Sequence, residues 1–211
     1  MKKLAFVGAG SHADAIRTFV DEKVYDLVGY FDDKDVEFHN GLPVIGRTSE
    51  VTKMLDLGVI DNVFITVGDN TKRAEWFENV AKNHYDAFIN IIAPTAVILE
   101  KKSLKGKGIF VGSGAFVGRN VTIGDDVIVN THAVVEHHSK VHSHVNLTPN
   151  AVIAGFVELE TGVYMGLSSS AIQLVTVSEW SVVGAGAVVV KSLTETGTYV
   201  GVPARKIGDK K

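Results

Sequence analysis

The sequence predicts a small α/β domain, a Rossmann-like half domain, over residues 1–90, followed by a parallel β-helix of hexapeptide repeats over residues 91–211. Two observations support this prediction. Strand-like and helix-like segments alternate in the first part, which is typical of parallel strands joined by crossover helices. From Val111 onward an aliphatic residue recurs at every sixth position, a period that fits neither a lone helix nor one long strand.

The α/β part is divided by its hydrophobic pattern into short segments. The expected strands are Lys3–Val7, Asp26–Phe31, Asn62–Val67 and Asp86–Ile91, and the expected helices run over His12–Glu22, Ser49–Leu57 and Thr71–Asn83. A glycine-containing loop, Gly8-Ala9-Gly10-Ser11, joins the first strand to the first helix.

The repeat part keeps its register over fourteen consecutive hexads. The aliphatic positions are Val111, Val117, Ile123, Val129, Val135, Val141, Leu147, Ile153, Leu159, Met165, Ala171, Val177, Val183 and Val189. Three hexads make one triangular coil, and each coil buries its aliphatic side chains against the next. Ile92, Ile98 and Leu104 keep the same rhythm but slip by one position before Val111, so we expect an irregular first coil.

Composition narrows the classes of function. Hydrophobic residues make up 45% of the 211 residues, as in ordinary globular proteins, and the net charge of -3 with no basic block gives no support for a nucleic-acid partner. The lack of cysteine excludes disulfides, thiolate metal sites and cysteine nucleophiles. No apolar run approaches the roughly 20 residues of a membrane span, and the short apolar start is interpreted as a buried strand. We therefore expect a cytoplasmic protein without a membrane partner.

Five of the eight histidines lie between His132 and His144. His132, His138 and His144 share one phase of successive hexads, so they are expected at three different corners of the coil. One subunit cannot easily gather them around one ion, and no metal site is predicted. His132, His142 and His144 are expected to be solvated corner residues.

His137 differs because Gly155 follows it by one full coil, at the same position of the hexad. A glycine beside an imidazole leaves room for a thin ligand and exposes a backbone N–H to it. A general base next to an oxyanion donor is the minimum apparatus for acyl transfer. The alternative from geometry alone is a surface histidine above a glycine turn. His138 belongs to the next corner position, so only His137 is expected to face the groove.

The first loop has the context of a phosphate-binding turn, since Gly8-Ala9-Gly10-Ser11-His12-Ala13 follows a strand and opens a helix. Asp32 lies at the end of the second strand, where an acid would meet a ribose hydroxyl. A domain of this size holds only half a dinucleotide fold, so one nucleotide fits better than NAD. The candidate contacts to this substrate are Gly8, Gly10, Ser11, His12, Asp32, Asp33, Gly68 and Asn70. Trp76 is expected to be a packing residue.

Three separate motifs carry a resemblance to a known family. These are the segment from Val129 to His138, the segment Thr148-Pro149-Asn150-Ala151-Val152-Ile153-Ala154-Gly155, and Gly201-Val202-Pro203-Ala204-Arg205. Together they resemble the NeuD/PglD-type sugar acyltransferases, which are bacterial hexapeptide-repeat enzymes that acetylate sialic acids or nucleotide-linked amino sugars. The resemblance covers nearly the whole chain, including the small α/β domain.

The resemblance implies a left-handed β-helix and a homotrimer with acetyl-CoA bound between neighbouring subunits. It implies that His137 is the catalytic base, that the Gly155 N–H binds the thioester carbonyl, and that Asn130 lies in the same site. The first domain would hold the nucleotide of a nucleotide-sugar, usually UDP. The residues expected to contact the coenzyme are Gly155, Leu167, Ala185, Pro203 and Arg205.

Two positions depart from the family pattern. His138 stands where an acidic residue usually follows the base, which leaves Glu136 as the candidate for orienting it. Asn146 stands where a second histidine often lies, further along the chain from the base. His138 and Asn146 are both expected among the substrate contacts.

These features predict an acetyl-CoA-dependent N-acetyltransferase that uses no metal and acts on a nucleotide-linked 4-amino sugar, with UDP as the expected nucleotide. Two alternatives stay open. One is O-acetylation of a sialic acid, and the other is a non-catalytic nucleotide-sugar-binding protein with a degenerate site.

Overall fold

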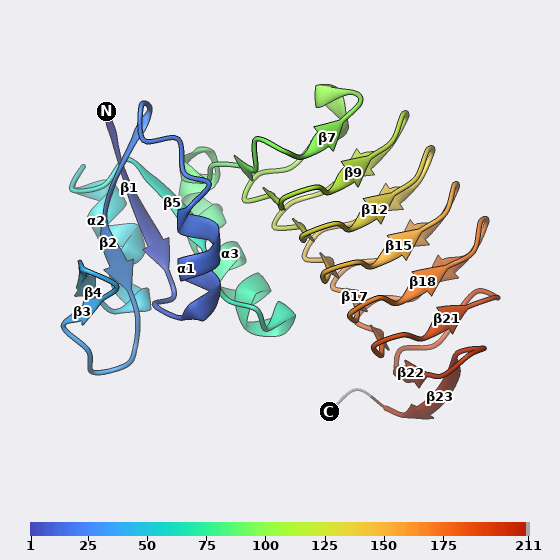
Figure 1. Cartoon of the computed structure of the whole chain (residues 1–211). Coiled ribbons are helices and arrows are strands. Elements are labelled where there is room, and N and C mark those ends of the chain that lie inside the picture. Colours follow the sequence, from blue (N-terminus) through green and yellow to red (C-terminus); the bar gives the residue numbers. More distant parts are fainter. Residues whose placement is uncertain (210–211) are drawn as a thin grey trace. The chain divides into compact units, whose positions relative to one another are not determined.

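The computed structural model describes residues 1–209 (Figure 1) and divides into two compact units, one over Met1–Ile91 and one from Ile92 onward. The expected boundary lay one position earlier, between residues 90 and 91. Within the described residues no helix is long and apolar enough to cross a membrane.

The first unit is a five-stranded sheet with the order β3-β4-β2-β1-β5. Its strands are β1 (Lys2–Val7), β2 (Tyr25–Phe31), β3 (Phe38–His39), β4 (Leu42–Gly46) and β5 (Asn62–Ile65). Its helices are α1 (Ser11–Arg17), α2 (Val51–Asp56) and α3 (Asn70–His84), with short 3-10 turns at Thr48–Glu50 and Tyr85–Ala87. Strands β1, β2 and β5 run parallel, as the alternating pattern predicts, so their carboxyl ends meet at one edge.

Three elements of this unit differ from the expectation. Helix α1 ends at Arg17, well before the predicted end at Glu22. A hairpin of β3 and β4 was not predicted, although its turn, Asn40-Gly41, has the positive φ angles of 45° and 79° that favour this dipeptide. In place of the predicted last strand, Asp86–Ile91, the chain has the end of a 3-10 turn, a single bridge between Val63 and Phe88, and at Ile91 the first residue of β6.

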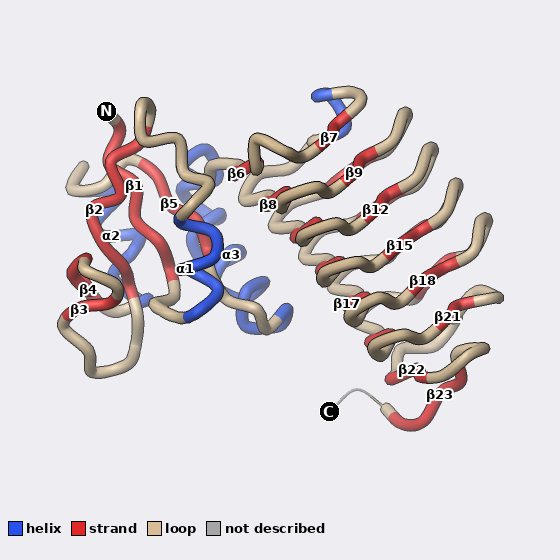
Figure 2. The backbone as a smooth tube through the Cα atoms, in the orientation of Figure 1, coloured by secondary structure: helices blue, strands red, loops and turns tan. Residues whose placement is uncertain are grey.

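The second unit is a parallel β-helix with three sheets (Figure 2). The first sheet contains β6 (Ile91–Ile92), β8 (Phe110–Val111), β11 (Ile128–Val129), β14 (Asn146–Leu147), β17 (Tyr164–Met165), β20 (Val182–Val183), β22 (Thr198–Val200) and β23 (Arg205–Gly208). The second contains β7 (Val97–Ile98), β9 (Phe116–Val117), β12 (Val134–Val135), β15 (Val152–Ile153), β18 (Ser170–Ala171) and β21 (Val188–Val189). The third contains β10 (Thr122–Ile123), β13 (Lys140–Val141), β16 (Glu158–Leu159) and β19 (Thr176–Val177). A 3-10 turn at Lys101–Ser103 lies in the first coil.

The register between successive coils is the predicted three hexads. Val134 pairs with Val152, and Ile128 pairs with Asn146. All fourteen aliphatic positions are buried in one core, so the hexad pattern is the pattern of that core. The slip in the first coil is also confirmed, because Ile98 pairs with Val117, one position beyond a regular coil.

The corners of the coil contain residues with positive φ that recur once in every hexad. His132, His138 and His144 have φ angles of 55°, 61° and 63°, so they occupy three successive corners, as predicted. The expectation that His144 is solvated is wrong. It is 4% exposed, and its Nδ1 lies 2.9 Å from Oδ2 of buried Asp126.

Candidate functional site

The first candidate centre lies where His137 packs against Gly155 in the next coil. His137 follows β12 and Gly155 follows β15, and these two strands pair in parallel. A Cβ atom at Gly155 would lie 2.5 Å from Cε1 of His137, closer than any real contact allows. The imidazole therefore rests directly on the glycine backbone, and a larger residue at position 155 would displace it. This is the arrangement that the repeat spacing predicted.

His138 lies against the same imidazole, which corrects the expectation that it faces elsewhere. The Nδ1 atoms of His137 and His138 are 3.1 Å apart, and the two rings are nearly perpendicular. The positive φ of 61° at His138 turns the chain at the corner, so its side chain reaches back toward the preceding residue. The two histidines form one hydrogen-bonded pair.

Glu136 is placed differently from its expected orienting role. Its Oε2 accepts a hydrogen bond of 3.3 Å from the backbone N–H of His137. The ring nitrogen that an orienting residue would engage, Nδ1 of His137, is the atom that faces His138. Glu136 thus holds the backbone of the candidate base, and His138 contacts its ring.

Two residues of this centre were not predicted, and both are one coil away from His138. Phe156 stacks on the His138 ring with the planes 7° apart and the centroids 4.6 Å apart, and it meets the His137 ring edge-on at 5.5 Å. Asn120 lies on the other side, with Nδ2 at 3.1 Å from Nε2 of His138. Counting three hexads forward and three hexads back from His138 would have found both residues.

Asn120 is held in turn by Glu100. The backbone N–H of Asn120 donates to Oε2 of Glu100 over 2.9 Å. This hydrogen bond is the main reason why the pKa of Glu100 is lowered, with smaller contributions from Lys102 and Arg119. The carboxylate therefore stays ionised and anchors the corner that carries Asn120.

Asn130 and Asn146 lie on or beside the neighbouring strands β11 and β14. The backbone N–H of Asn130 donates to the Leu147 carbonyl, and its side-chain Oδ1 accepts from the Thr131 N–H over 2.8 Å. Asn146 is 4% exposed, and within the described residues its Oδ1 has no hydrogen-bond partner. A buried amide oxygen without a partner costs free energy, so a polar ligand group could compensate it.

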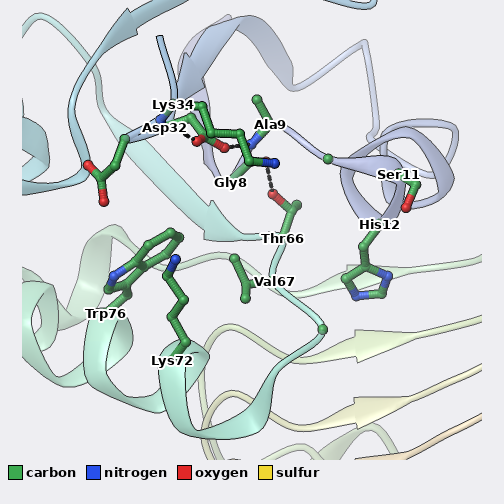
Figure 3. A pocket seen from close by; sticks show the side chains of 13 residues that line it. Gly8, Ala9, Ser11, His12, Asp32, Lys34, Thr66, Val67, Lys72 and Trp76 are labelled. Carbon is green, nitrogen blue, oxygen red and sulfur yellow. Dashed lines mark hydrogen bonds between the residues drawn. The ribbon is translucent and has the colours of Figure 1, made fainter. Parts of the chain in front are cut away.

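The second candidate centre is a cavity of about 410 Å³ in the first unit (Figure 3). Its lining includes the predicted residues Gly8, Gly10, Ser11, His12, Asp32, Asp33 and Gly68, together with Ala9, Lys34, Thr66, Val67, Lys72 and Trp76. The glycine turn between β1 and α1 requires glycine at position 8, because Gly8 has a φ of 109° and a Cβ there would lie 2.8 Å from Val67. Gly10 has nothing within 4 Å of its Cβ position, so that side of the turn is open.

The acidic residues of the cavity are tied to the backbone. Asp32 is buried, and its Oδ2 accepts from the Ala9 N–H over 2.7 Å while Oδ1 accepts from the Lys34 N–H over 2.9 Å. Asp33 accepts from both the N–H and the hydroxyl of Thr48. The bond to Ala9 fixes the loop after β2 against the glycine turn, and the bonds of Asp33 tie the same loop to the 3-10 turn at Thr48–Glu50.

Asn70 lies outside this lining, in contrast to the expectation. It begins helix α3, and its Oδ1 accepts from the buried guanidinium of Arg73 over 2.9 Å. Its role is to hold Arg73, one turn further along the helix.

His12 is a neutral group in this environment. Burial lowers its pKa to about 4, and the positive charge of Arg73 acts in the same direction. The imidazole therefore offers the cavity a hydrogen-bonding group without a charge at neutral pH.

Lys72 and Trp76 were missed as lining residues, and Trp76 was expected to be packing only. They stand at the i and i+4 positions of α3 and so share one face of the helix, with the Lys72 Nζ 4.7 Å from the centre of the indole ring. Figure 3 shows both side chains rising from α3 toward the loop that carries Asp32 and Lys34. Trp76 and Asp33 also line an adjoining cavity of about 430 Å³. The indole thus stands between two hollows, with a cation beside it.

The comparisons with known proteins cover both units of the chain. Residues 3–80 match the family model of the PglD N-terminal domain. The chain is similar to the acetyltransferase domain of PglB from Neisseria gonorrhoeae, with 29% identity, coverage of 98% of this chain and 100% of that one, and a TM-score of 0.87. It is also similar to PerB from Caulobacter crescentus, solved with CoA and GDP-perosamine, with 27% identity, coverage of 99% and 98%, and a TM-score of 0.88.

The chain is thus similar to the NeuD/PglD-type sugar acyltransferases, as its sequence motifs predicted. The predicted fold class is also confirmed: a Rossmann-like half domain is followed by a left-handed parallel β-helix. WeeI from Acinetobacter baumannii, with 20% identity, coverage of 98% and 100%, and a TM-score of 0.80, has the same fold. The PglB domain has also been solved with acetyl coenzyme A.

The residues expected to contact the coenzyme lie at two different corners of the coil. Gly155 precedes the corner residue Phe156, whereas Leu167 and Ala185 precede the corner residues Ser168 and Gly186. These two corners flank the sheet that contains β12 and β15. Pro203 and Arg205 lie near the end of the chain, where the backbone N–H of Ala204 donates to Val188 in the same sheet. Leu167 is 54% exposed at its corner.

Among the described residues there is no group of three or more metal-ligating side chains. His142 lies 2.9 Å from Oε1 of Glu158, and this hydrogen bond is the largest cause of the lowered pKa of Glu158. Both residues are at the surface, apart from the two candidate centres.

Proposed function

We propose that this protein is an acetyl-CoA-dependent N-acetyltransferase that acts on a nucleotide-linked 4-amino sugar in bacterial glycan or glycoprotein biosynthesis. The observation that carries the proposal is the imidazole of His137 packed on the backbone of Gly155, on the β-helix of a NeuD/PglD-type protein. Support comes from two relatives, one described as an acetyltransferase domain and one solved with CoA and GDP-perosamine.

In the proposed reaction the amine of the sugar attacks the thioester carbonyl of acetyl-CoA. The new C–N bond forms as the C–S bond breaks, His137 takes the proton from the amine through Nε2, and the departing sulfur finally receives a proton to leave as CoA thiol. The Gly155 N–H stabilises the negative charge on the carbonyl oxygen in the tetrahedral intermediate. No covalent enzyme intermediate is needed, which suits a chain without cysteine.

The cavity of the first unit is the proposed site for the nucleotide of the acceptor. Its open glycine turn and its two lysines suit a diphosphate, since backbone N–H groups and cations favour anions. The indole of Trp76 is a flat surface on which a base can stack. We propose UDP as the nucleotide. PerB, solved with GDP-perosamine, makes GDP the alternative to test.

A trimer with active sites between subunits is the proposed assembly. Gly155 lies at one corner of the coil, while Leu167 and Ala185 lie at another. A coenzyme in a groove between two subunits would use one corner from each of them. Light scattering tests this proposal, because a stable, active monomer of 22.7 kDa would contradict both the trimer and the shared site. The cytoplasm is the proposed location, because it supplies acetyl-CoA and nucleotide sugars.

A thiol-release assay tests the proposed function. Acetyl-CoA would be offered with UDP-, dTDP- and GDP-linked 4-amino sugars and with sialic acids. We expect turnover with a nucleotide-linked amino sugar. Turnover of sialic acid alone would assign O-acetylation instead, and CoA binding without turnover of any acceptor would assign a non-catalytic binding protein.

A further inference from the structure

The pair of His137 and His138 shares a single hydrogen when both rings are neutral. Their Nδ1 atoms are 3.1 Å apart, so one ring donates and the other accepts. A neutral imidazole carries its hydrogen on only one nitrogen. If His137 donates from Nδ1, its Nε2 has a lone pair for a substrate proton; if it accepts at Nδ1, its Nε2 carries the hydrogen and cannot act as a base.

Asn120 decides between these two arrangements, because it contacts the far nitrogen of His138. In the structure the Nδ2 atom of Asn120 lies 3.1 Å from Nε2 of His138, which is the orientation in which the amide donates. When its NH₂ group donates, His138 must carry its hydrogen on Nδ1 and donate to His137. When its Oδ1 faces the ring, His138 carries the hydrogen on Nε2, and its Nδ1 is free to accept from His137. A half-turn of the amide therefore selects the tautomer of both rings.

We infer that His138, held by Asn120, is the positioning residue that keeps His137 in the tautomer of a general base. This inference rests on the proposed function. In the productive arrangement the Asn120 amide is rotated by half a turn from the orientation in the structure. Its Oδ1 then accepts from His138 Nε2, and His138 Nδ1 accepts from His137 Nδ1. His138 thus acts as a neutral hydrogen-bond acceptor for His137. A carboxylate at this position would be a charged acceptor.

The surroundings hold the pair in this geometry. Phe156 stacks on His138 with the ring planes 7° apart, and this contact fixes the plane of the accepting nitrogen. Glu100 accepts from the Asn120 N–H, and Lys102 and Arg119 interact with that carboxylate. Glu136 accepts from the His137 N–H. The carboxylates of Glu100 and Glu136 thus bind the backbone N–H groups of Asn120 and His137. The Nδ1 atoms of His137 and His138 bind each other.

A neutral acceptor and a charged acceptor should give the rate different pH dependences. Protonation of either ring turns it into a double donor and breaks the productive arrangement. The acid limb of kcat/KM should therefore begin with a slope of one on a logarithmic plot and steepen toward two only at a pH where both rings are protonated. A carboxylate in place of His138 would stabilise the protonated His137 ring, so that the acid limb would move to higher pH by roughly one unit.

The test uses substitutions that the corner backbone tolerates. The φ of 61° at His138 suits glycine and aspartate better than alanine. His138→Gly should lower kcat by about 10–100-fold, the usual effect of losing an orienting partner, with little change in KM for acetyl-CoA and an acid-limb slope of one. His138→Asp should recover most of the rate and show the shifted acid limb. His132→Gly, at the preceding corner with a φ of 55°, is the matched control and should retain the wild-type rate.

Asn120 gives the second arm of the test. Asn120→Asp places an oxygen, which only accepts, toward His138 and should retain activity. Asn120→Gly, which the φ of 56° at this corner tolerates, should lose about tenfold. Nitrogen-15 NMR of the histidine rings reads the tautomers without any turnover. We expect hydrogen on Nδ1 of His137 and on Nε2 of His138 in the wild-type protein at neutral pH.

Full activity of His138→Gly with an unchanged pH profile, or a wild-type His137 ring with its hydrogen on Nε2, would overturn the inference. These outcomes differ from failure of the proposed function, in which wild-type protein releases no thiol with any acceptor. The NMR measurement would then still decide the tautomer.

Discussion

The two units of this protein build their candidate sites by different rules. In the β-helix, contacts follow from spacing alone: Gly155 lies one coil after His137, and Phe156 lies one coil after His138. In the α/β unit, the cavity is assembled from loops after β1, β2 and β5 together with one face of α3. A repeat therefore turns sequence distance into spatial contact directly, whereas an α/β layer requires the path of the chain to be known first.

The residues of the site in the β-helix also have less positional freedom than those of the cavity in the α/β unit. Each coil places backbone against backbone at a fixed step, so a ring can rest on a glycine only if both positions keep their register. The cavity of the α/β unit has open space instead, since nothing lies within 4 Å of the Cβ position of Gly10 or of Gly68. Changes in the first site should act on catalysis, and changes in the second should act on binding.

The sharpest separation of the two sites comes from His137→Ala. It should lower kcat by about 10²–10⁴, or ~2.7–5.5 kcal/mol of transition-state stabilisation, because the base acts as the bond forms. KM for acetyl-CoA should change little. Steady-state thiol release measures both constants. A normal kcat in this variant would show that His137, at the corner of the β-helix, is not the catalytic base.

Gly155→Ala tests whether spacing in the repeat controls the rate. The new Cβ would meet the His137 ring at 2.5 Å, so the imidazole must move. A displacement of about 1 Å of a catalytic group can cost roughly 100-fold in kcat. The rate should fall while circular dichroism and the oligomeric mass stay the same. An unchanged rate would show that the ring does not need its position on the glycine.

His12 gives the stability of the α/β unit a pH dependence of its own. The pKa of His12 is lowered to about 4, so between about pH 6.5 and 4 the unfolded chain binds a proton that the folded chain does not. The free energy of unfolding should therefore fall as the pH drops through this range. At pH 5 the loss should be about 2 kcal/mol greater for wild type than for His12→Gln.

Urea unfolding at pH 7.5 and pH 5 measures this difference. His132→Asn, at an exposed corner of the β-helix with a φ of 55° that asparagine tolerates, is the control and should show the wild-type pH dependence. Equal pH dependence in all three proteins would mean that His12 is not kept neutral by its surroundings.

Of the changes considered, Gly10→Val should have the smallest effect in free energy, and this effect should be on substrate binding. The side chain would project from the turn into open space, so it should leave folding unchanged and crowd the phosphates. We expect KM for the sugar nucleotide to rise by about tenfold, or ~1.4 kcal/mol, with unchanged calorimetric affinity for acetyl-CoA. Loss of acetyl-CoA affinity with normal nucleotide binding would reverse the assignment of ligands to the two units.

Much of the β-helix could be predicted because one physical rule governs every coil. Burial of each sixth residue indicated the register, the three corners and the stacking of His137 on Gly155. The direction of the His138 ring could not be predicted from the hexad phase, since it depends on the left-handed corner geometry and on Phe156 and Asn120. The burial of His144 depends in the same way on a partner, Asp126, in the preceding coil.

The α/β unit was harder to predict in its details. The glycine turn and Asp32 were found because they follow strands, where a parallel sheet collects its ligand contacts. Trp76 was missed because an aromatic residue on an amphipathic helix looks the same whether it faces a core or a cavity. Asn70 lies outside the lining of the cavity because its side chain binds Arg73 on the same helix, and only the structure shows that bond.

A crystal structure with CoA and a UDP-linked 4-amino sugar would test the central claim most directly. The central claim is that the repeat performs the chemistry while the α/β unit holds the nucleotide. We expect the nucleotide to lie against Gly8, Gly10 and Trp76, and the sugar amine to lie within about 3 Å of Nε2 of a His137 ring. A nucleotide bound outside that cavity, or an amine beyond the reach of every His137 in the assembly, would contradict it.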